Sequence, residues 1–111
     1  MSISAKLFLQ RKDMNKTEER FSFALDQGVK SGKYLQWFFE DITLRLGDNC
    51  RYTPDFAVLL SDMTFRFYEV KGFWRDDARV KIKVAASKYP FFEFRAVVWK
   101  KNTWEVEVIK P

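Results

Sequence analysis

Two carboxylates and one lysine flank a short apolar part of this 111-residue chain, and their types and spacing suit metal-ion chemistry. Asp55 precedes one apolar run, and Glu69 and Lys71 close the next. Both runs are rich in β-branched and aromatic residues, and a Ser-Asp-Met turn around Asp62 separates them, which predicts a β-hairpin. Its strands are expected at residues 56–60 and 65–70.

A hairpin centred on Asp62 places Asp55 opposite Glu69. Directly opposed strand residues have Cβ atoms roughly 4.5–5.5 Å apart, so the two negative charges repel each other unless a cation lies between them. Lys71 points to the same side as Glu69, roughly 6–7 Å further along, because strand side chains alternate between faces. This arrangement is suited to metal-dependent phosphodiester cleavage, in which the lysine stabilises charge on the phosphate or helps to deprotonate the attacking water.

The kind of metal follows from what the sequence lacks. It has no histidine and a single cysteine, Cys50, which excludes histidine catalysis, a zinc site built on these residues and a disulfide framework. Oxygen ligands point instead to Mg²⁺, with Mn²⁺ as a substitute. The free cysteine also fits a reducing, cytoplasmic compartment, and no segment predicts a signal peptide or a membrane span.

Glu18 is a third candidate carboxylate. Asn15 is a good N-cap and Glu18 follows in the capping-box position, which predicts a helix over residues 16–30. Glu18 lies in line with Phe21 on the apolar face of this helix, whereas Glu19 lies about 100° further round. We therefore expect Glu18 to be the ligand, with a purely capping role as the alternative.

The hairpin residues also have an ordinary structural explanation. Asp55 could simply begin a strand, and Glu69 could be an edge charge paired with Lys71. However, a strand made otherwise of Phe, Tyr and Val should not bury a carboxylate that has neither a partner nor a metal. The two carboxylates considered together favour a functional site.

Basic residues indicate the partner. Twenty Lys and Arg against fifteen Asp and Glu give a net charge of +5, which favours a polyanion. A helix predicted over residues 74–88 carries a basic residue every fourth position along one edge and begins beside Lys71. A solvated basic face is the alternative to phosphate contact. The candidates for DNA contact are Arg75, Arg79, Lys83, Lys81 and Arg51.

Length and patterning predict the fold. The chain is long enough for one domain, expected over residues 15–111, with residues 1–14 as a basic arm or strand. The aromatic residues are expected mainly in the core. Further strands are expected at residues 34–46, bent near Glu40-Asp41, and at residues 92–99 and 104–109. The order α-β-β-β-α-β-β predicts an α/β (α+β) fold with a mixed sheet flanked by helices.

These residues together carry a family resemblance. Glu18, Pro54-Asp55 and Glu69-Val70-Lys71 resemble the PD-(D/E)xK nuclease motif. The longer pattern, from Tyr52-Thr53-Pro54-Asp55-Phe56 through Glu69-Val70-Lys71-Gly72-Phe73-Trp74 to Tyr89-Pro90, is similar to the phage endonuclease I type of Holliday-junction-resolving enzyme and to related small phage nucleases. The likeness runs from about residue 15 to residue 98.

The resemblance implies a restriction-endonuclease-like fold and a phage-encoded, Mg²⁺-dependent DNA endonuclease. Asp55, Glu69 and the Val70 carbonyl would hold a metal ion, Glu18 would assist a second, and Lys71 would support the attack. It also implies a branched-DNA substrate, a role in DNA recombination in the host-cell cytoplasm, and a homodimer, although junction-resolving relatives carry a further basic C-terminal region that does not follow Pro111 here.

Two other functions remain open on the sequence. The chain could be a non-catalytic DNA-binding or protein-interaction module that keeps the nuclease fold. It could also be a purely structural protein with ion-paired strand ends, which leaves the facing of Asp55 and Glu69 unexplained.

Overall fold

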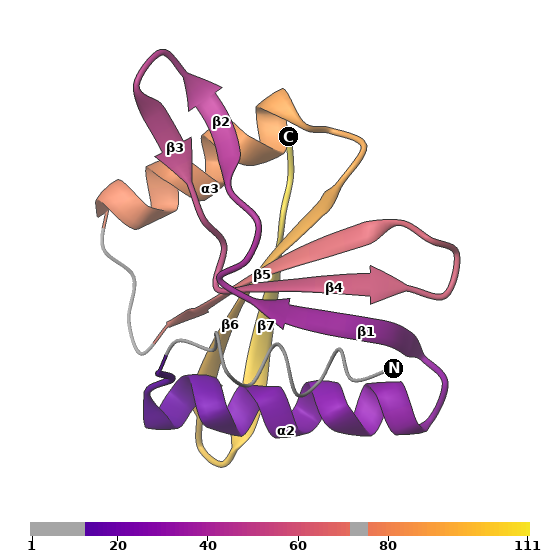
Figure 1. The fold of residues 1–111 in the computed structure, drawn as a ribbon. Coiled ribbons are helices and arrows are strands. Elements are labelled where there is room, and N and C mark those ends of the chain that lie inside the picture. Colours follow the sequence, from indigo (N-terminus) through magenta and orange to yellow (C-terminus); the bar gives the residue numbers. More distant parts are fainter. Residues whose placement is uncertain (1–12, 72–75) are drawn as a thin grey trace.

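The computed structural model describes residues 13–71 and 76–111 and contains two helices and seven strands within them (Figure 1). In chain order the elements are α2 (Lys16–Lys30), β1 (Tyr34–Phe39), β2 (Leu44–Gly47), β3 (Cys50–Tyr52), β4 (Phe56–Leu60), β5 (Phe65–Lys71), α3 (Asp76–Lys88), β6 (Glu93–Lys100) and β7 (Thr103–Ile109).

Five strands form one sheet in the order β1-β4-β5-β6-β7, and β2 and β3 form a separate two-stranded sheet. In the larger sheet β5 and β6 are parallel, because α3 connects them, and the other neighbouring strands are antiparallel. The large sheet is therefore mixed, and the predicted α+β class is confirmed.

The β4–β5 hairpin has the predicted register. Phe56 faces Tyr68 and Leu59 faces Phe65, so each pair is centred on residue 62. The Leu60 N–H donates to the Thr64 carbonyl at 2.8 Å and closes the turn. Because side chains alternate with a period of two, this register determines which of them share a face of the sheet.

The strand predicted over residues 34–46 is wrong, because this segment forms two strands in different sheets. β1 ends at Phe39, the chain turns at Glu40 with a positive φ of 52°, and β2 starts at Leu44. The bend was expected, but β3 was not, so the predicted order has three strands between the helices where the structure has five. At three residues, β3 is too short to show an alternating pattern.

Helix α2 begins and ends as predicted. The Asn15 side chain accepts a hydrogen bond from the Glu18 N–H at 2.8 Å, and the Glu18 side chain accepts one from the Asn15 N–H at 2.9 Å. Gly32, with a φ of +82°, follows the last turn, where a residue with a side chain would be strained. For the other helix, the predicted start near Trp74 lies outside the described residues, and Lys88 ends it two residues before Pro90.

The two helices cover opposite faces of the large sheet (Figure 1). On one face, Phe21 and Leu25 of α2 pack with Phe56 of β4. On the other, Ile82 and Ala85 of α3 pack with strand residues of the large sheet and with one side of the β2–β3 sheet. The aromatic residues fill both cores, as expected, and the end of β1, the start of β4 and the end of β5 meet near the N-terminus of α2.

Candidate active site

Asp55 lies between Glu40, which directly follows β1, and Glu69 of β5. The register that pairs Phe39 with Phe56, continued by one residue, brings Glu40 to one side of Asp55, and the Glu40 N–H donates to the Asp55 carbonyl at 2.9 Å. The β4–β5 register brings Glu69 to the other side. The Val70 N–H then donates to Asp55 Oδ2 at 2.8 Å and fixes the carboxylate at the end of the sheet.

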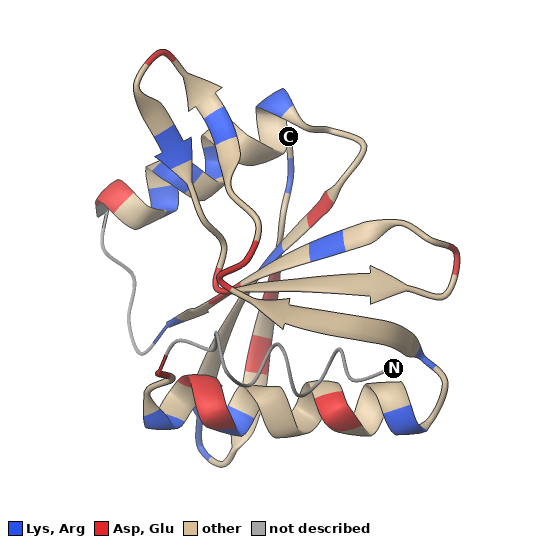
Figure 2. Cartoon of the chain, viewed as in Figure 1, with Lys and Arg blue, Asp and Glu red and all other residues tan. Residues whose placement is uncertain are grey.

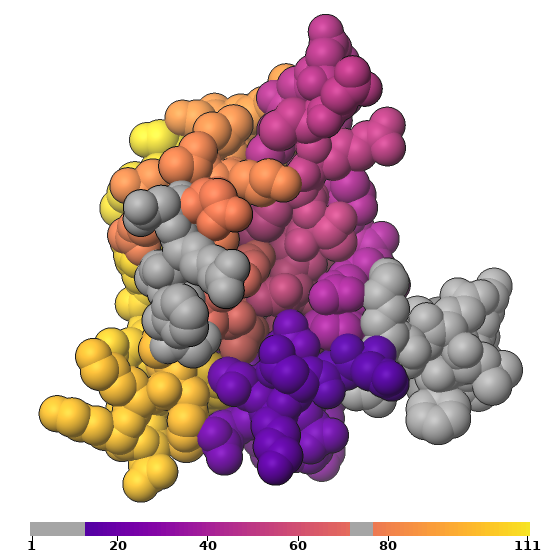
Figure 3. Space-filling model, turned by 90° about the vertical axis from the view of Figure 1, so that its left-hand side faces the viewer, coloured from indigo at the N-terminus to yellow at the C-terminus, as the bar shows by residue number. Residues whose placement is uncertain are grey.

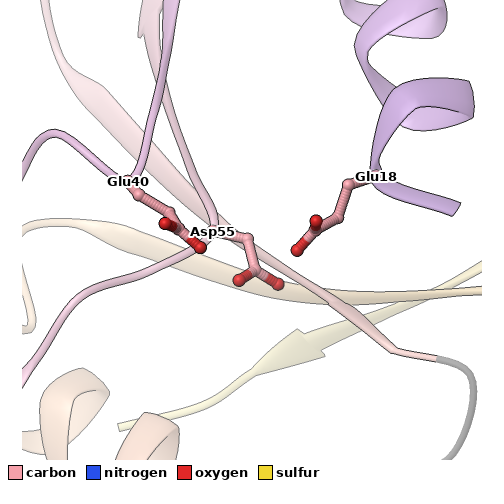
Figure 4. A group of neighbouring side chains, drawn as sticks. All are labelled: Glu18, Glu40 and Asp55. Atoms are coloured by element: carbon pink, nitrogen blue, oxygen red, sulfur yellow. The ribbon is translucent and has the colours of Figure 1, made fainter. Parts of the chain in front are cut away.

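Three carboxylates converge on one point. Glu18, Glu40 and Asp55 each offer an oxygen, and these oxygens lie within 4.8 Å of one another. Figure 4 shows Glu18 reaching toward Asp55 from the first turn of α2, while Glu40 approaches from the other side. Octahedral Mg²⁺, with ligands at about 2.0–2.1 Å, separates neighbouring oxygens by about 3 Å and opposite ones by about 4 Å. An upper limit of 4.8 Å between the oxygens of the cluster is close to the larger of these separations.

Glu69 is held by two partners within the site. Its Oε1 accepts a hydrogen bond from the Tyr52 hydroxyl at 2.5 Å, and its Oε2 lies 2.8 Å from Lys71 Nζ. Only 5% of Glu69 is exposed, so these contacts compensate the burial of its charge. Lys71 lies beside Glu69 on one face of the sheet, as expected. The ion pair between them, which was the structural alternative to a functional site, is also observed.

Burial controls the protonation of this site. Burial of Asp55, together with the charge of Glu69, raises its pKa to about 7, even though the Val70 N–H and Lys71 lower it. Burial likewise raises the pKa of Glu18, with contributions from Glu40 and Glu69 against the Asn15 N–H. Carboxylates that resist ionisation next to one another have too few positive partners, and a bound cation would supply the missing charge.

Lys71 and Tyr52 remain protonated in this environment. Burial lowers the pKa of Lys71, but its hydrogen bond to Glu69 and the charges of Asp55 and Glu18 outweigh that effect and raise it. Burial and the adjacent Glu69 raise the pKa of Tyr52. Both side chains are therefore donors at neutral pH.

The sequence interpretation missed Glu40. The residue follows the apolar run Trp37-Phe38-Phe39 and has a positive φ, which non-glycine residues rarely adopt. A charged residue at the predicted bend was the available signal. Without the pairing of β1 with β4, however, nothing in the sequence brings Glu40 beside Asp55. For Val70, the N–H contact to Asp55 is observed, and metal binding by its carbonyl stays a prediction.

Four of the five predicted basic residues lie in the described part of the chain, on α3 or beside it. Arg75 lies outside the described residues. Arg79 makes a bidentate ion pair with Glu107 of β7, at 3.0 and 2.6 Å. Lys83 shares with Glu107 and the end of β7 a surface pocket of about 460 Å³. On the other edge of α3, Lys81 Nζ donates to the Arg51 carbonyl at 3.4 Å, so these two candidates are neighbours.

The first turns of α2, the β2–β3 sheet and α3 all face one side of the molecule (Figure 3). The acidic cluster lies between them, since it takes Glu18 from α2 and Asp55 from the segment that follows β3.

Searches of protein-family models, curated proteins and solved structures found no match to this chain. Among the described residues, no helix is both long and apolar enough to span a membrane. A function is therefore inferred from the residues and geometry of the site itself.

Proposed function

We propose that this protein is a Mg²⁺-dependent endonuclease that hydrolyses phosphodiester bonds of DNA at the site formed by Glu18, Glu40, Asp55, Glu69 and Lys71. The observation that carries the proposal is the buried Asp55, 9% exposed, with the carboxylates of Glu40 and Glu69 on either side of it. Burial of a carboxylate costs folding free energy, so a role in function explains this residue better than a role in stability.

The chemistry of the ligands supports a cation site. Glu18, Glu40 and Asp55 converge beside the ion pair of Glu69 with Lys71, whose atoms lie 2.8 Å apart. Three oxygens from glutamate and aspartate, with no nitrogen or sulfur donor, suit Mg²⁺ or Mn²⁺.

The residues have distinct roles in the proposed reaction. A metal ion at this site would polarise the phosphate and help to ionise the attacking water. Asp55, Glu18 and Glu40 would hold it, and the Val70 N–H keeps the Asp55 carboxylate oriented. Lys71, whose pKa is raised, suits stabilisation of the charge that develops on the phosphate better than removal of a proton from water.

Cleavage assays test the proposal directly. Labelled duplex, nicked, flapped, single-stranded and four-way DNA are incubated with Mg²⁺, Mn²⁺ or EDTA. We expect cleavage that requires the metal, is abolished by Asp55→Asn and falls on the order of 10²–10⁴ in Lys71→Ala, which still binds metal. Glu19→Gln, at an exposed position one residue from the site, is the matched control and should cleave like the wild type.

Two results would refute this function. One is the absence of metal-dependent cleavage on every substrate by protein that is folded and binds Mn²⁺. The other is cleavage that survives in Asp55→Asn, which would assign the activity to another site or to a contaminant.

A further inference from the structure

The two-stranded β2–β3 sheet has one buried and one exposed side. Leu44 and Tyr52 are buried against α3 and the large sheet, whereas Arg45 and Arg51 are exposed on the other side. The alternation follows from the two-residue period of strands. One side of this two-stranded ribbon therefore belongs to the hydrophobic core, and its exposed side is basic.

Arg45 and Arg51 are direct partners across the ribbon. Like charges directly opposite each other destabilise a strand pair. Arg45 contacts Asp48 at the ribbon tip at 2.5 Å, but their side chains are 64% and 93% exposed, and such pairs contribute little. The Arg51 side chain makes no hydrogen bond or ion pair with any described residue. The repulsion between the two arginines is therefore mostly uncompensated within the described part of the chain.

A third positive charge comes from α3. Lys81 Nζ lies 3.4 Å from the Arg51 carbonyl, so its ammonium is beside the ribbon. Figure 2 shows Lys and Arg on β2, on β3 and on α3 next to them. Asp48 is the single acidic residue between positions 44 and 52. We call Arg45, Arg51 and Lys81 the ribbon cluster.

The ribbon is tied to the acidic site. Tyr52, the last residue of β3, donates its hydroxyl to Glu69, and Asp55 follows three residues later. The Thr43 and Thr53 hydroxyls, 2.7 Å apart, close the base of the ribbon. The base of the ribbon is therefore next to the carboxylates.

We propose that the ribbon cluster binds the phosphate backbone of duplex DNA beside the bond that is cut. This inference rests on the proposed function for DNA as the partner. Arginine forms bidentate contacts with phosphate, and two exposed arginines side by side suit neighbouring phosphates of one strand. Phosphates between Arg45 and Arg51 remove the repulsion that the free ribbon carries. Continuity with a site for phosphodiester cleavage favours nucleic acid over an acidic protein.

The test measures DNA binding in EDTA, where no cleavage occurs. Fluorescence anisotropy of a short labelled duplex, over a series of salt concentrations, is compared for wild type, the double variant Arg45→Gln/Arg51→Gln, and Lys81→Gln. The matched control is Lys30→Gln/Lys33→Gln, which removes the same charge from two exposed positions at the C-terminal end of α2. Lys30 lies twelve residues along α2 from Glu18, about 18 Å from the site.

Phosphate contacts predict a specific change in salt dependence. The log–log salt slope should fall by about 2 in the arginine double variant and by about 1 in Lys81→Gln, and it should stay at the wild-type value in the control. Thermal unfolding should show the arginine variant to be as stable as the wild type or more stable, because repulsion is relieved. Polyglutamate should compete only weakly.

The outcomes separate this inference from the proposed function. Salt slopes equal to those of the control, no duplex binding by the wild type, or displacement by polyglutamate as efficient as by DNA would overturn the ribbon assignment. If the slopes change as expected but Mg²⁺ produces no cleavage, the ribbon stands and the nuclease proposal falls. If the wild type cleaves DNA and the arginine variant binds and cleaves equally well, the nuclease proposal stands and the ribbon assignment falls.

Discussion

At the residue scale, Asp55 couples protonation to stability and, under the proposed function, to metal binding. Its carboxyl is buried, and its pKa in the folded protein is about 7 against an ordinary value of 3.8. A single structural hydrogen bond, from the Val70 N–H, does not offset burial next to Glu69. The folded chain therefore favours either a proton or a cation at this position, and a metal ion would compete with the proton more effectively as pH rises.

The first prediction concerns pH and stability in EDTA. Between about pH 4 and 7, the unfolded chain has released the Asp55 proton while the folded chain keeps it, so stability falls as pH rises through this window and the loss is complete above the folded pKa. Each pKa unit corresponds to about 1.4 kcal/mol. Denaturant unfolding across this range should show the fall in wild type and a much flatter profile in Asp55→Asn.

The control for this measurement is Asp62→Asn in the exposed β4–β5 turn, which should keep the wild-type decline because the pKa of Asp62 is not raised. Mg²⁺ should restore stability above pH 7 in wild type and in this control, but not in Asp55→Asn. Parallel pH profiles for wild type and Asp55→Asn would show that the carboxyl is not held in a protonated state.

Tyr52 gives a second prediction at this scale. Tyr52→Phe leaves Glu69 Oε1 without its donor, and because Glu69 is buried the change should destabilise the protein by about 1.5–3 kcal/mol. Tyr89→Phe removes the same group from a hydrogen bond to the Arg45 carbonyl, which is neutral, so its loss should be about 0.5–1.5 kcal/mol. Chemical denaturation compares the two, and equal losses would show that the charge of Glu69 adds nothing to its hydrogen bond.

At the element scale, the parts of the fold that could be predicted are those encoded by residues close together in the sequence. Helix α2 followed from its capping box, and the β4–β5 register followed from alternation around residue 62. The position of Asp55 opposite Glu69 could therefore be predicted from the residues alone. The pairing of β1 with β4 brings together residues far apart in the chain, and no local signal encodes it. That pairing places Glu40, which explains why this carboxylate was not predicted.

Helix α2 combines a structural and a proposed catalytic role in one residue, and the third prediction separates them. Glu18 closes the capping box and also points at Asp55. Glutamine can serve the same cap position, so Glu18→Gln should unfold like the wild type in EDTA yet lose Mn²⁺ affinity and cleavage. Glu18→Ala should lose these and also about 0.5–2 kcal/mol of stability.

Calorimetric Mn²⁺ titration and denaturant unfolding measure the two roles independently. Glu19→Gln, on the exposed side of the same turn, should behave as wild type in both. If Glu18→Gln retains full metal affinity and cleavage, Glu18 acts only as a cap, and the ligands reduce to Asp55 and Glu40.

At the scale of the whole molecule, the described residues of each chain form one acidic site, so cutting two strands of a branched DNA in one encounter requires two chains. Edge strand β7 could pair with its own copy only in some registers. In an antiparallel pairing centred on Val106, Glu105 would face Glu107 of the partner, and like charges directly opposite repel. A dimer through the β7 edge should therefore avoid this register.

The last prediction joins assembly to substrate. Branched DNA offers flexible phosphate geometry and two duplex arms. The described residues include cationic side chains on the β2–β3 ribbon and on α3, but no motif that reads bases. We therefore expect the shape of the DNA rather than its sequence to select the substrate. Sedimentation with a four-way junction should give two chains per junction, and at matched salt the junction should bind more tightly than linear duplex. On a plasmid with an extruded cruciform, a dimer makes paired cuts and yields linear product directly, whereas a monomer accumulates nicked circles first. Three results would together describe a non-selective nuclease: one chain per junction, equal affinity for junction and linear duplex, and accumulation of nicked circles. The predicted junction preference would then be wrong, although the proposed chemistry of the site would stand.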